Sequence, residues 1–346
     1  MRDDGTWVFM SLLPFLHRAT AGSDLTAEEA YHAMSALLEG SAGESVIAGF
    51  LVALKMKGET AAELAGFARA MRERMIVVDA GPGVIDTCGT GGDASGTFNI
   101  STAAALVMAG AGARVAKHGN RSLSSQTGSA DVLEALGVRI SMTPEEAARA
   151  VREIGIGFLF APSLHPAMKH AQPVRRALKI RTVFNLLGPL ANPARAQRQL
   201  IGAPSPEAAA LMAGALAELG MERAFVVHGR DGLDEVSTTG PTDVWEITGG
   251  RVEKHLWTPS DFGVQRASLD ALQGGDADRN AQIIRAILHG ERGAARDIAL
   301  VNAAAGLVVA DLARDLKSAV AAAAQAIDSK AAAGKLAELQ ENFPIS

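Results

Sequence analysis

Apolar residues recur at every third or fourth position from Leu12 to about Met75, which predicts a series of amphipathic helices. Three capping-box signatures, each a Ser or Thr three positions before a Glu, indicate where helices begin. They are Thr26 with Glu29, Ser41 with Glu44 and Thr60 with Glu63. The segment 46–56 is apolar on more than one face, which indicates burial by the rest of the chain and by a second subunit. We therefore expect a small α-helical domain over residues 12–80 that forms a homodimer.

The pattern changes after Asp79-Ala-Gly-Pro-Gly83, where we expect a turn and a hinge. Beyond it, short β-branched runs alternate with helical runs, which is typical of an α/β domain with a mainly parallel sheet. The expected strands are 84–88, 113–117, 138–140, 156–160, 198–203 and 224–228, followed by a hairpin of 244–247 and 252–257. The expected helices are 101–110, 129–136, 144–154 and 206–219, followed by alanine-rich helices between 280 and 339. This second domain is expected to span 81–346.

Two stretches depart from these patterns. Prolines break the region 162–197 into short helices and loops, which we expect to cross back to the helical domain. Residues 1–11 show no periodic pattern and are expected to be an N-terminal extension, with Met10 a candidate start of the native protein.

Composition and charge narrow the classes of function. The 346 residues are 48% hydrophobic and 21% charged, which is ordinary for a globular protein. The net charge of −5 argues against nucleic-acid and membrane-surface binding. Cys88 is the single cysteine, so neither a disulfide scaffold nor a cysteine-based metal site is expected. The chain has no apolar run of about 18 residues and no signal-like start, so we expect a cytoplasmic protein without a membrane partner.

A glycine-rich stretch, Gly89-Thr-Gly-Gly-Asp93, lies between a predicted strand and a predicted helix. In that position backbone N–H groups and a helix N-terminus bind anions. The stretch is neither a Walker A loop nor a dinucleotide fingerprint, since no Gly-Lys-Ser/Thr follows and Ala94 occupies the third glycine position. A plain glycine turn is the alternative, but polar residues follow it at the start of the helix. They are Thr97, Asn99, Ser101 and Thr102, of which Ser101 could also ligate magnesium.

The next strand ends in Lys117-His-Gly-Asn-Arg121. Lys117 and Arg121 place two positive charges beside the proposed phosphates, although a solvated basic loop is the simpler alternative. His118 could be a general base or a structural histidine held by a backbone hydrogen bond. The hydroxyl-rich surface continues through Ser122, Ser124, Ser125 and Ser129. Asp131 and Glu134 open the following helix, and we expect them to cap it rather than bind metal.

Two further groups of charges are candidates for a site. The adjacent carboxylates of Asp234 and Glu235 follow a strand and suit a hard cation that carries a pyrophosphate, although adjacent acids are often merely solvated. A guanidinium in the basic run 173–181 could pair with a carboxylate of a second substrate, and a solvated helix face is the alternative. Cys88 is expected to pack under the glycine-rich loop without a chemical role.

Together these motifs resemble the signature of the anthranilate phosphoribosyltransferase family, and the resemblance covers nearly all of the chain after Leu12. The matching segments are 89–93, 99–102, 117–121, 128–134, 165–170, 181–190 and 234–237. The resemblance implies a helical domain hinged to an α/β domain, a homodimer, and two Mg²⁺ ions. It also implies transfer of a phosphoribosyl group from 5-phosphoribosyl-1-diphosphate to anthranilate, a step of tryptophan biosynthesis.

The resemblance also implies the roles of individual residues. Anthranilate would contact Gly89, Asn120 and Arg175, while Ser101 would ligate one magnesium ion and Asp234 with Glu235 the other. Residues implied for the diphosphate donor are Gly89, Gly92, Asp93, Thr97, Asn99, Ile100, Ser101, Thr102, Lys117, His118, Gly119, Asn120, Arg121, Ser122, Leu123, Ser124, Ser125 and Ser129. Departures from the family pattern are few. Leu123 and Gln126 occupy variable positions, and Gln126 is often basic in the family, which bears on donor affinity.

Two other readings use the same fold. Pyrimidine nucleoside phosphorylases have similar glycine and lysine loops but lack the Lys-His-Gly-Asn-Arg motif. Non-catalytic paralogues that bind nucleic acid would be expected to lose the glycine-rich loop and to carry a basic face. This chain keeps the glycine-rich loop and the Lys-His-Gly-Asn-Arg motif and is net acidic, which argues against both readings. They are kept as the alternatives to phosphoribosyl transfer.

Overall fold

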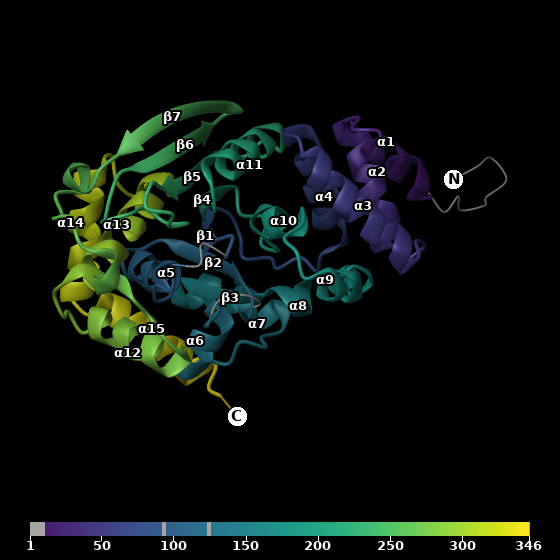
Figure 1. Cartoon of the computed structure of the whole chain (residues 1–346). Coiled ribbons are helices and arrows are strands. Elements are labelled where there is room, and N and C mark those ends of the chain that lie inside the picture. The colour runs from purple at the N-terminus through teal and green to yellow at the C-terminus, as the bar shows by residue number, and fades with distance from the viewer. Residues whose placement is uncertain (1–10, 92–94, 123–125, 346) are drawn as a thin grey trace.

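The computed structural model describes residues 11–91, 95–122 and 126–345, and begins with a bundle of helices (Figure 1). The bundle comprises α1 (Leu13–Thr20), α2 (Ala27–Leu38), α3 (Glu44–Lys57) and α4 (Ala61–Arg74). The capping boxes predicted at Thr26 and Thr60 are confirmed. The one predicted at Ser41 is wrong. α3 starts after Gly43 without a side-chain cap, because the Ser41 hydroxyl instead donates to the carbonyl of Ala36 in α2 at 3.1 Å.

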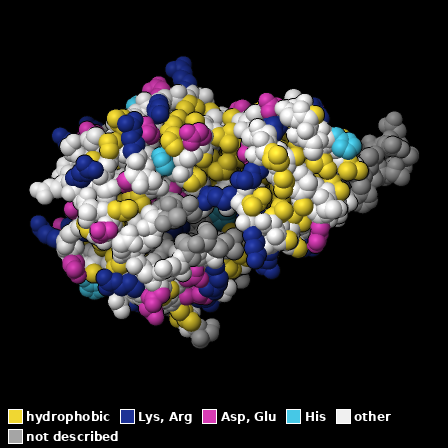
Figure 2. Space-filling view, in the orientation of Figure 1, with side chains coloured by type: hydrophobic (Ala, Val, Ile, Leu, Met, Phe, Trp, Pro, Cys, Tyr) yellow, Lys and Arg dark blue, Asp and Glu magenta, His cyan; other side chains and the backbone are white. Residues whose placement is uncertain are grey.

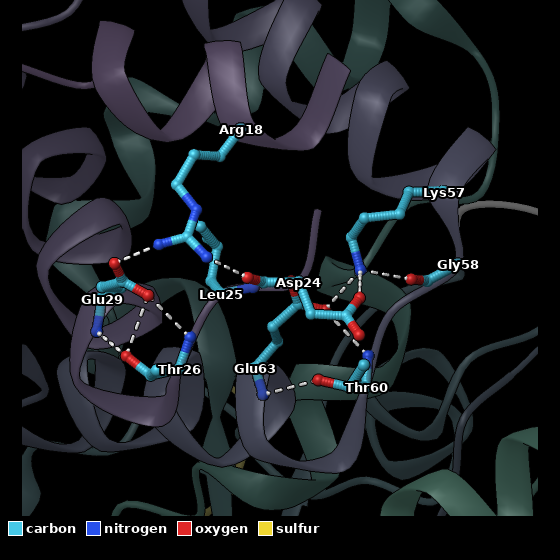
Figure 3. Close-up of polar contacts among 9 residues, drawn as sticks. All are labelled: Arg18, Asp24, Leu25, Thr26, Glu29, Lys57, Gly58, Thr60 and Glu63. Atoms are coloured by element: carbon cyan, nitrogen blue, oxygen red, sulfur yellow. Dashed lines mark hydrogen bonds and ion pairs between the residues drawn. The ribbon is translucent and has the colours of Figure 1, made fainter. Parts of the chain in front are cut away.

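A network of charged groups ties the helices of the bundle together (Figure 3). The Glu63 side chain, which is fully buried, accepts the backbone N–H groups of Leu25 at 2.9 Å and Thr60 at 2.8 Å. It also accepts the Lys57 ammonium at 2.9 Å, and that ammonium donates to Asp24 at 2.7 Å. A buried carboxylate is stable only when its charge and hydrogen-bonding capacity are satisfied in this way. The network therefore fixes the start of α4 against the end of α3 and the α1–α2 loop.

Within the described residues the second part is built on one seven-stranded sheet of order β3-β2-β1-β4-β5-β6-β7. Its strands are β1 (Val84–Gly89), β2 (Arg114–Gly119), β3 (Ile156–Phe160), β4 (Arg198–Gly202), β5 (Arg223–Gly229), β6 (Thr242–Thr248) and β7 (Arg251–Trp257). Strands β1 to β5 are parallel, and the β6–β7 hairpin adds two antiparallel strands at one edge. The predicted fold class, a mainly parallel α/β unit with a smaller helical domain, is confirmed. The strand order reverses between β1 and β4, and ligands of such sheets bind at the carboxyl ends of the strands beside that point.

The strand predicted at 138–140 is wrong. Val138 forms an isolated antiparallel bridge with Pro344, and the N–H of Arg139 donates to the carbonyl of Phe343 at 2.8 Å. The short segment between α6 (Ser129–Ala135) and α7 (Pro144–Arg149) thus pairs with the C-terminal tail rather than with the sheet. The helix expected over 144–154 is present, but its last turn, Ala150–Ile154, is a π-helix.

Helices cover both faces of the sheet (Figure 1). The remaining α-helices are α5 (Ile100–Gly110), α8 (Ala161–Leu164), α9 (Gln172–Leu178), α10 (Phe184–Leu190), α11 (Pro206–Glu218), α12 (Ala277–Leu288), α13 (Ala294–Val309), α14 (Leu316–Asp328) and α15 (Ala331–Asn342). Single turns of 3₁₀-helix cover Pro166–His170, Pro259–Phe262 and Leu269–Leu272. α5 and α13 pack together over one face, and α11 covers the other face and packs on α4. Each face of the sheet has its own hydrophobic core. Along β5, Phe225 and Val227 pack in the core on the side of α5 and α13, and Ala224 and Val226 pack in the core on the side of α11, because successive side chains of a strand point to opposite faces.

The region of 162–197 lies between these two parts. α9 contacts α3, and α10 contacts α4 and α11, so Val174, Phe184 and Leu187 share a core with the helical bundle. In the chain segments that the structure describes, no helix has the length and apolar character needed to cross a membrane.

Candidate active site

A cleft of about 660 Å³ opens at the carboxyl ends of β1 and β2, bounded on its other side by α9 and α10. Figure 2 shows a hollow between the two lobes of the molecule, with Lys and Arg side chains gathered along its edge. The volume is within the range of about 300–1,000 Å³ that small-molecule sites occupy.

The cleft brings together most of the residues that the sequence singles out. Those that line it are Gly89, Thr97, Asn99, Ile100, Ser101, Lys117, His118, Gly119, Asn120, Arg121, Ser122, Ser129, Arg175, Asp234 and Glu235. Thr102 does not line it, because its side chain is buried within α5. Predicted residues Gly92, Asp93, Leu123, Ser124 and Ser125 lie outside the described residues.

Asp234 lies against the glycine-rich turn that follows β1. Its Oδ2 accepts the N–H of Gly91 at 3.0 Å, and a Cβ at Gly89 would lie 2.6 Å from the same oxygen. At the end of β4, a Cβ at Gly202 would overlap the carbonyl oxygen of Asp234. The two glycines therefore allow the acidic loop to approach the sheet.

The neighbouring Glu235 reaches the start of α5, where its Oε1 accepts the N–H of Ser101 at 3.2 Å. Asp234, Glu235 and Ser101 thus offer carboxylate and hydroxyl oxygens in one cleft, and oxygen ligands are what Mg²⁺ prefers. No cluster of three or more His, Cys, Asp or Glu side chains with metal-binding geometry occurs among residues 11–91, 95–122 and 126–345. A site of this kind suits a Mg²⁺ ion that takes its other ligands from substrate phosphates and water.

Lys117 provides a positive charge at the floor of the cleft. Its side chain comes from β2 and is almost fully buried, and its Nζ donates to the carbonyl of Thr87 at 2.7 Å and to Ser101 Oγ at 3.2 Å. Burial lowers the pKa of Lys117, and the nearby carboxylate of Asp86 opposes that shift. The ammonium is therefore held beside the N-terminus of α5, where an anion would bind.

His118 is buried beside His165, with 5.1 Å between the ring centroids. Burial lowers the pKa of His118 to about 3, with a further contribution from His165, while a hydrogen bond with the backbone of Gly188 opposes the shift. Burial likewise lowers the pKa of His165 to about 4. Nε2 of each ring lacks a hydrogen-bond partner in the part of the chain that the structure describes. The geometry favours a neutral, structural His118 over a general base that works near pH 7.

Arg121 lies at the rim, where about half of its side chain is exposed. It pairs with Asp131 at 2.8 Å and Glu134 at 2.6 Å. Asp131 also accepts the N–H groups of Gly128 at 2.9 Å and Ser122 at 3.2 Å, so it caps α6 as predicted. The positive charge of Arg121 is therefore compensated by acids of the following helix, whereas the carboxylate near Lys117 is that of Asp86 on the neighbouring strand.

Arg175 comes from α9, on the opposite wall from the sheet. Its guanidinium carbon lies 5.2 Å from the ring centroid of Phe184, within the range of a cation–π interaction. Burial lowers the pKa of Arg175, and none of the ion pairs within the described ranges involves it. A partly buried guanidinium with this environment suits the carboxylate of a ligand.

Sequence reasoning missed two groups of cleft residues. Asn280 of α12 donates to Asn99 Oδ1 at 2.9 Å and accepts the N–H of Gly275 at 2.8 Å, which orients Asn99. No local motif marks Asn280, because it reaches the cleft from a distant part of the chain. The second group is an apolar wall around Arg175, to which Met71, Met168, Phe184 and Pro189 contribute. Met168, Phe184 and Pro189 lie in the segments 165–170 and 181–190, which match the family motifs but had no role assigned to them; Met71 lies outside these segments, in α4.

Comparison with known proteins agrees with this geometry. The family model described as "Glycosyl transferase family, a/b domain" matches residues 81–333, and that described as "Glycosyl transferase family, helical bundle domain" matches residues 13–75. The chain is 57% identical to the anthranilate phosphoribosyltransferase of Solibacter usitatus, over 96% of this chain and 98% of that protein.

Solved structures are similar over the same extent. The anthranilate phosphoribosyltransferase of Thermus thermophilus has a TM-score of 0.90 and 45% identity, over 95% of this chain and 98% of that one. The anthranilate phosphoribosyltransferase of Saccharomyces cerevisiae in complex with PRPP (5-phosphoribosyl-1-diphosphate) and Mg has a TM-score of 0.88 and 28% identity, over 96% of this chain and 97% of that one. The chain therefore belongs to the anthranilate phosphoribosyltransferase family.

Proposed function

We propose that this chain transfers the 5-phosphoribosyl group of 5-phosphoribosyl-1-diphosphate (PRPP) to the amine of anthranilate. The bond between C1′ and the diphosphate oxygen breaks, a bond between C1′ and the amine nitrogen forms, and the proton that the amine loses passes to the departing diphosphate or to water. The products are N-(5-phosphoribosyl)anthranilate and diphosphate. One observation carries the proposal: a single cleft joins a cationic, hydroxyl-rich floor to a partly buried arginine suited to a carboxylate.

The donor diphosphate is assigned to the floor of the cleft. Lys117, the N-terminus of α5 and the hydroxyl of Ser101 lie together there, and they offer charge-assisted hydrogen bonds to phosphate oxygens. The yeast relative, whose structure contains PRPP and Mg, supports this assignment by its overall similarity. The other donor residues expected from the sequence stay predictions, including those outside the described residues.

Magnesium is proposed at two positions, with Ser101 at one ion and with Asp234 and Glu235 at the other. When bound, Mg²⁺ supplies positive charge that stabilises the diphosphate as it leaves. The protein residues contribute the remaining preorganisation. Lys117 is already held by the Thr87 carbonyl at 2.7 Å, so it needs no reorganisation as negative charge develops on the leaving group.

Anthranilate is assigned to the wall formed by α9 and α10. Arg175 would bind its carboxylate, the apolar wall would bind its ring, and Gly89 and Asn120 would complete the contacts. The aromatic amine is a weak base, so it is neutral and nucleophilic near pH 7. A general base is therefore not needed, in keeping with the pKa of about 3 for His118.

The wider setting is also a proposal. The sequence predicts a cytoplasmic enzyme of tryptophan biosynthesis that dimerises through its helical domain. Apolar side chains exposed on that domain, Met56 of α3 at 83% and Leu13 of α1 at 45%, support the predicted contact. Light scattering at micromolar concentration tests it, and a monomer would contradict it.

A direct assay tests the proposed reaction. When both PRPP and Mg²⁺ are present, the purified chain should consume anthranilate, so the fluorescence of free anthranilate should fall. Omission of either PRPP or Mg²⁺ should abolish this decrease. Formation of diphosphate in equal amount is the matching second readout. Persistent anthranilate fluorescence together with phosphorolysis of a pyrimidine nucleoside would instead favour the nucleoside phosphorylase reading.

A further inference from the structure

Strands β1 and β2 are neighbours in the sheet but separate at the edge that faces the cleft. Their backbone register ends at Ile85 opposite Val115. Beyond that point β1 remains paired with β4, and β2 remains paired with β3, to their carboxyl ends. At the first separated position, Asp86 Oδ1 accepts the N–H of His118 at 3.1 Å. A side-chain carboxylate thus takes over the link between the two strands.

Lys117 occupies the gap that this separation leaves. The carboxylate of Asp86 holds the peptide group that follows Lys117, and the neighbouring carbonyl of Thr87 holds its Nζ at 2.7 Å. The same ammonium then reaches Ser101 Oγ at 3.2 Å. Two consecutive residues of β1 therefore hold Lys117 at both ends, at its backbone and at its charge.

Asp86 is fully buried, and burial raises its pKa. Hydrogen bonding by Asn192, the charge of Lys117 and the N–H of His118 oppose that shift. The Asn192 amide also donates to the carbonyl of Ala116 at 2.9 Å, so it supports β2 beside the same carboxylate. At such positions, well-packed apolar side chains often give the fold at least as much stability as buried charges do. A carboxylate in the strand core, next to the donor floor, therefore calls for a function.

We propose that Asp86 is a positioning residue of the donor site, which places the Lys117 ammonium at Ser101 for the diphosphate. The inference rests on the proposed function, because it concerns the binding of PRPP. Asp86 itself is covered and does not line the cleft, so it acts through Lys117. Loss of its charge should therefore affect the donor and spare the acceptor.

The test is steady-state kinetics of the full chain with Asp86→Asn, which keeps the shape and an acceptor oxygen for the His118 N–H. The KM for PRPP should rise about tenfold or more, the scale of a lost charge-assisted interaction. The KM for anthranilate should stay within about twofold. Glu63→Gln is the matched control, since Glu63 is a buried carboxylate of the helical bundle. Neither Glu63 nor its polar partners Leu25, Lys57 and Thr60 line the cleft, so this variant should leave both KM values unchanged.

A double-mutant cycle separates positioning from general stability. Asp86→Asn added to Lys117→Met should worsen the KM for PRPP no further than Lys117→Met does by itself. An unchanged KM for PRPP in Asp86→Asn, equal losses for both substrates, or multiplying losses in the double variant would overturn the inference. If Asp86→Asn does not fold, Asp86→Glu carries the same test, because its carboxylate is displaced by one methylene. An inactive wild type would refute the proposed function instead.

Discussion

Two cations of the cleft differ in how their charge is compensated. Lys117 is almost fully buried, is held by the Thr87 carbonyl, and has the carboxylate of Asp86 nearby. Arg175 lies over the ring of Phe184, and no ion pair in the described ranges involves it. Lys117 is thus placed before a substrate arrives, whereas the charge of Arg175 is left for a ligand. The two residues are expected to act on different substrates.

Replacement of Arg175 by Ala should raise the KM for anthranilate by about tenfold to a hundredfold, the scale of a charge-assisted hydrogen bond pair. The KM for PRPP should change much less, because the donor floor is built from other elements. Fluorescence kinetics with each substrate varied in turn measures both constants. Arg176→Ala, one position further on α9 and exposed, is the matched control. Equal losses for the two substrates would contradict the assigned role.

Replacement of Asp234 by Asn together with Glu235 by Gln should raise the Mg²⁺ concentration needed for half-maximal activity, by about tenfold or more. Amides keep the size of the side chains but remove the charge that attracts the cation. The measurement is a metal titration at fixed concentrations of PRPP and anthranilate. A titration curve identical to that of the wild type would show that these carboxylates do not hold the metal.

At the scale of elements, close packing of loops assembles the site. The β4 strand ends at Gly202, and the loop with Asp234 lies directly against it. Glu235 of the same loop contacts the start of α5. The acidic loop is therefore coupled to the glycine-rich turn through the Asp234 side chain, and to β4 through a backbone contact at Gly202 that admits no side chain.

Gly202→Ala should push the acidic loop away from β4. We expect a loss of stability of about 1–3 kcal/mol from overpacking, together with a higher Mg²⁺ requirement. Gly240→Ala is the control, because a Cβ there would have no neighbour within 4 Å. Thermal unfolding and the metal titration provide the two readouts. Similar behaviour of the two variants would argue against the proposed coupling.

In the helical bundle, Glu63→Ala should lower the free energy of unfolding by about 3 kcal/mol. It leaves the buried Lys57 with only the exposed carboxylate of Asp24, and it removes the acceptor of the Leu25 and Thr60 N–H groups. Thr26→Ala removes a single helix cap and should cost about 1 kcal/mol. Urea denaturation compares the two variants. If Glu63→Ala costs no more than Thr26→Ala, the network of Figure 3 does not hold the bundle together.

At the scale of the whole molecule, the sheet separates two cores, and the helical bundle belongs to one of them. Buried residues of α4, α10 and α11 and one face of β4 to β6 form a single apolar cluster. The other face packs on α5 and α13. His118 and His165 lie buried where the sheet and the crossing region meet, so their protonation should affect the stability of the whole fold.

Stability should fall as the pH is lowered from neutral. The folded-state pKa values of about 3 for His118 and about 4 for His165 lie below the unfolded value of about 6.5. The unfolded chain therefore binds more protons in between. The contribution of the two neutral rings is fully present above about pH 6.5 and is lost as the pH falls toward their folded pKa values.

Unfolding temperatures between pH 7.5 and pH 4.5 check this expectation. The pH dependence should be shallower in His118→Gln, whereas the exposed His17→Gln should match the wild type. A slope unaffected by His118→Gln would assign the acid sensitivity to other groups.

Local signals in the sequence were sufficient for much of the fold. The caps at Thr26 and Thr60, the alternation of strands and helices, and the strand–loop–helix context of Gly89 each depend on neighbours within a few positions. Such signals failed where another hydrogen-bond partner, near or distant along the chain, competed. Residues 138–140 had the composition of a strand but paired with the C-terminal tail, and the Ser41 hydroxyl bonded to the preceding helix.

The sequence by itself determined the fold class, the family and the two loops that carry the donor motifs, because their residues lie close together along the chain. Only the tertiary structure decided how groups from distant segments meet. It placed Asp234 against Gly91, compensated Arg121 with Asp131 and Glu134, and buried Asp86 beneath the site. These outcomes depend on burial and close backbone approach, and both arise only when the sheet and the helices pack together.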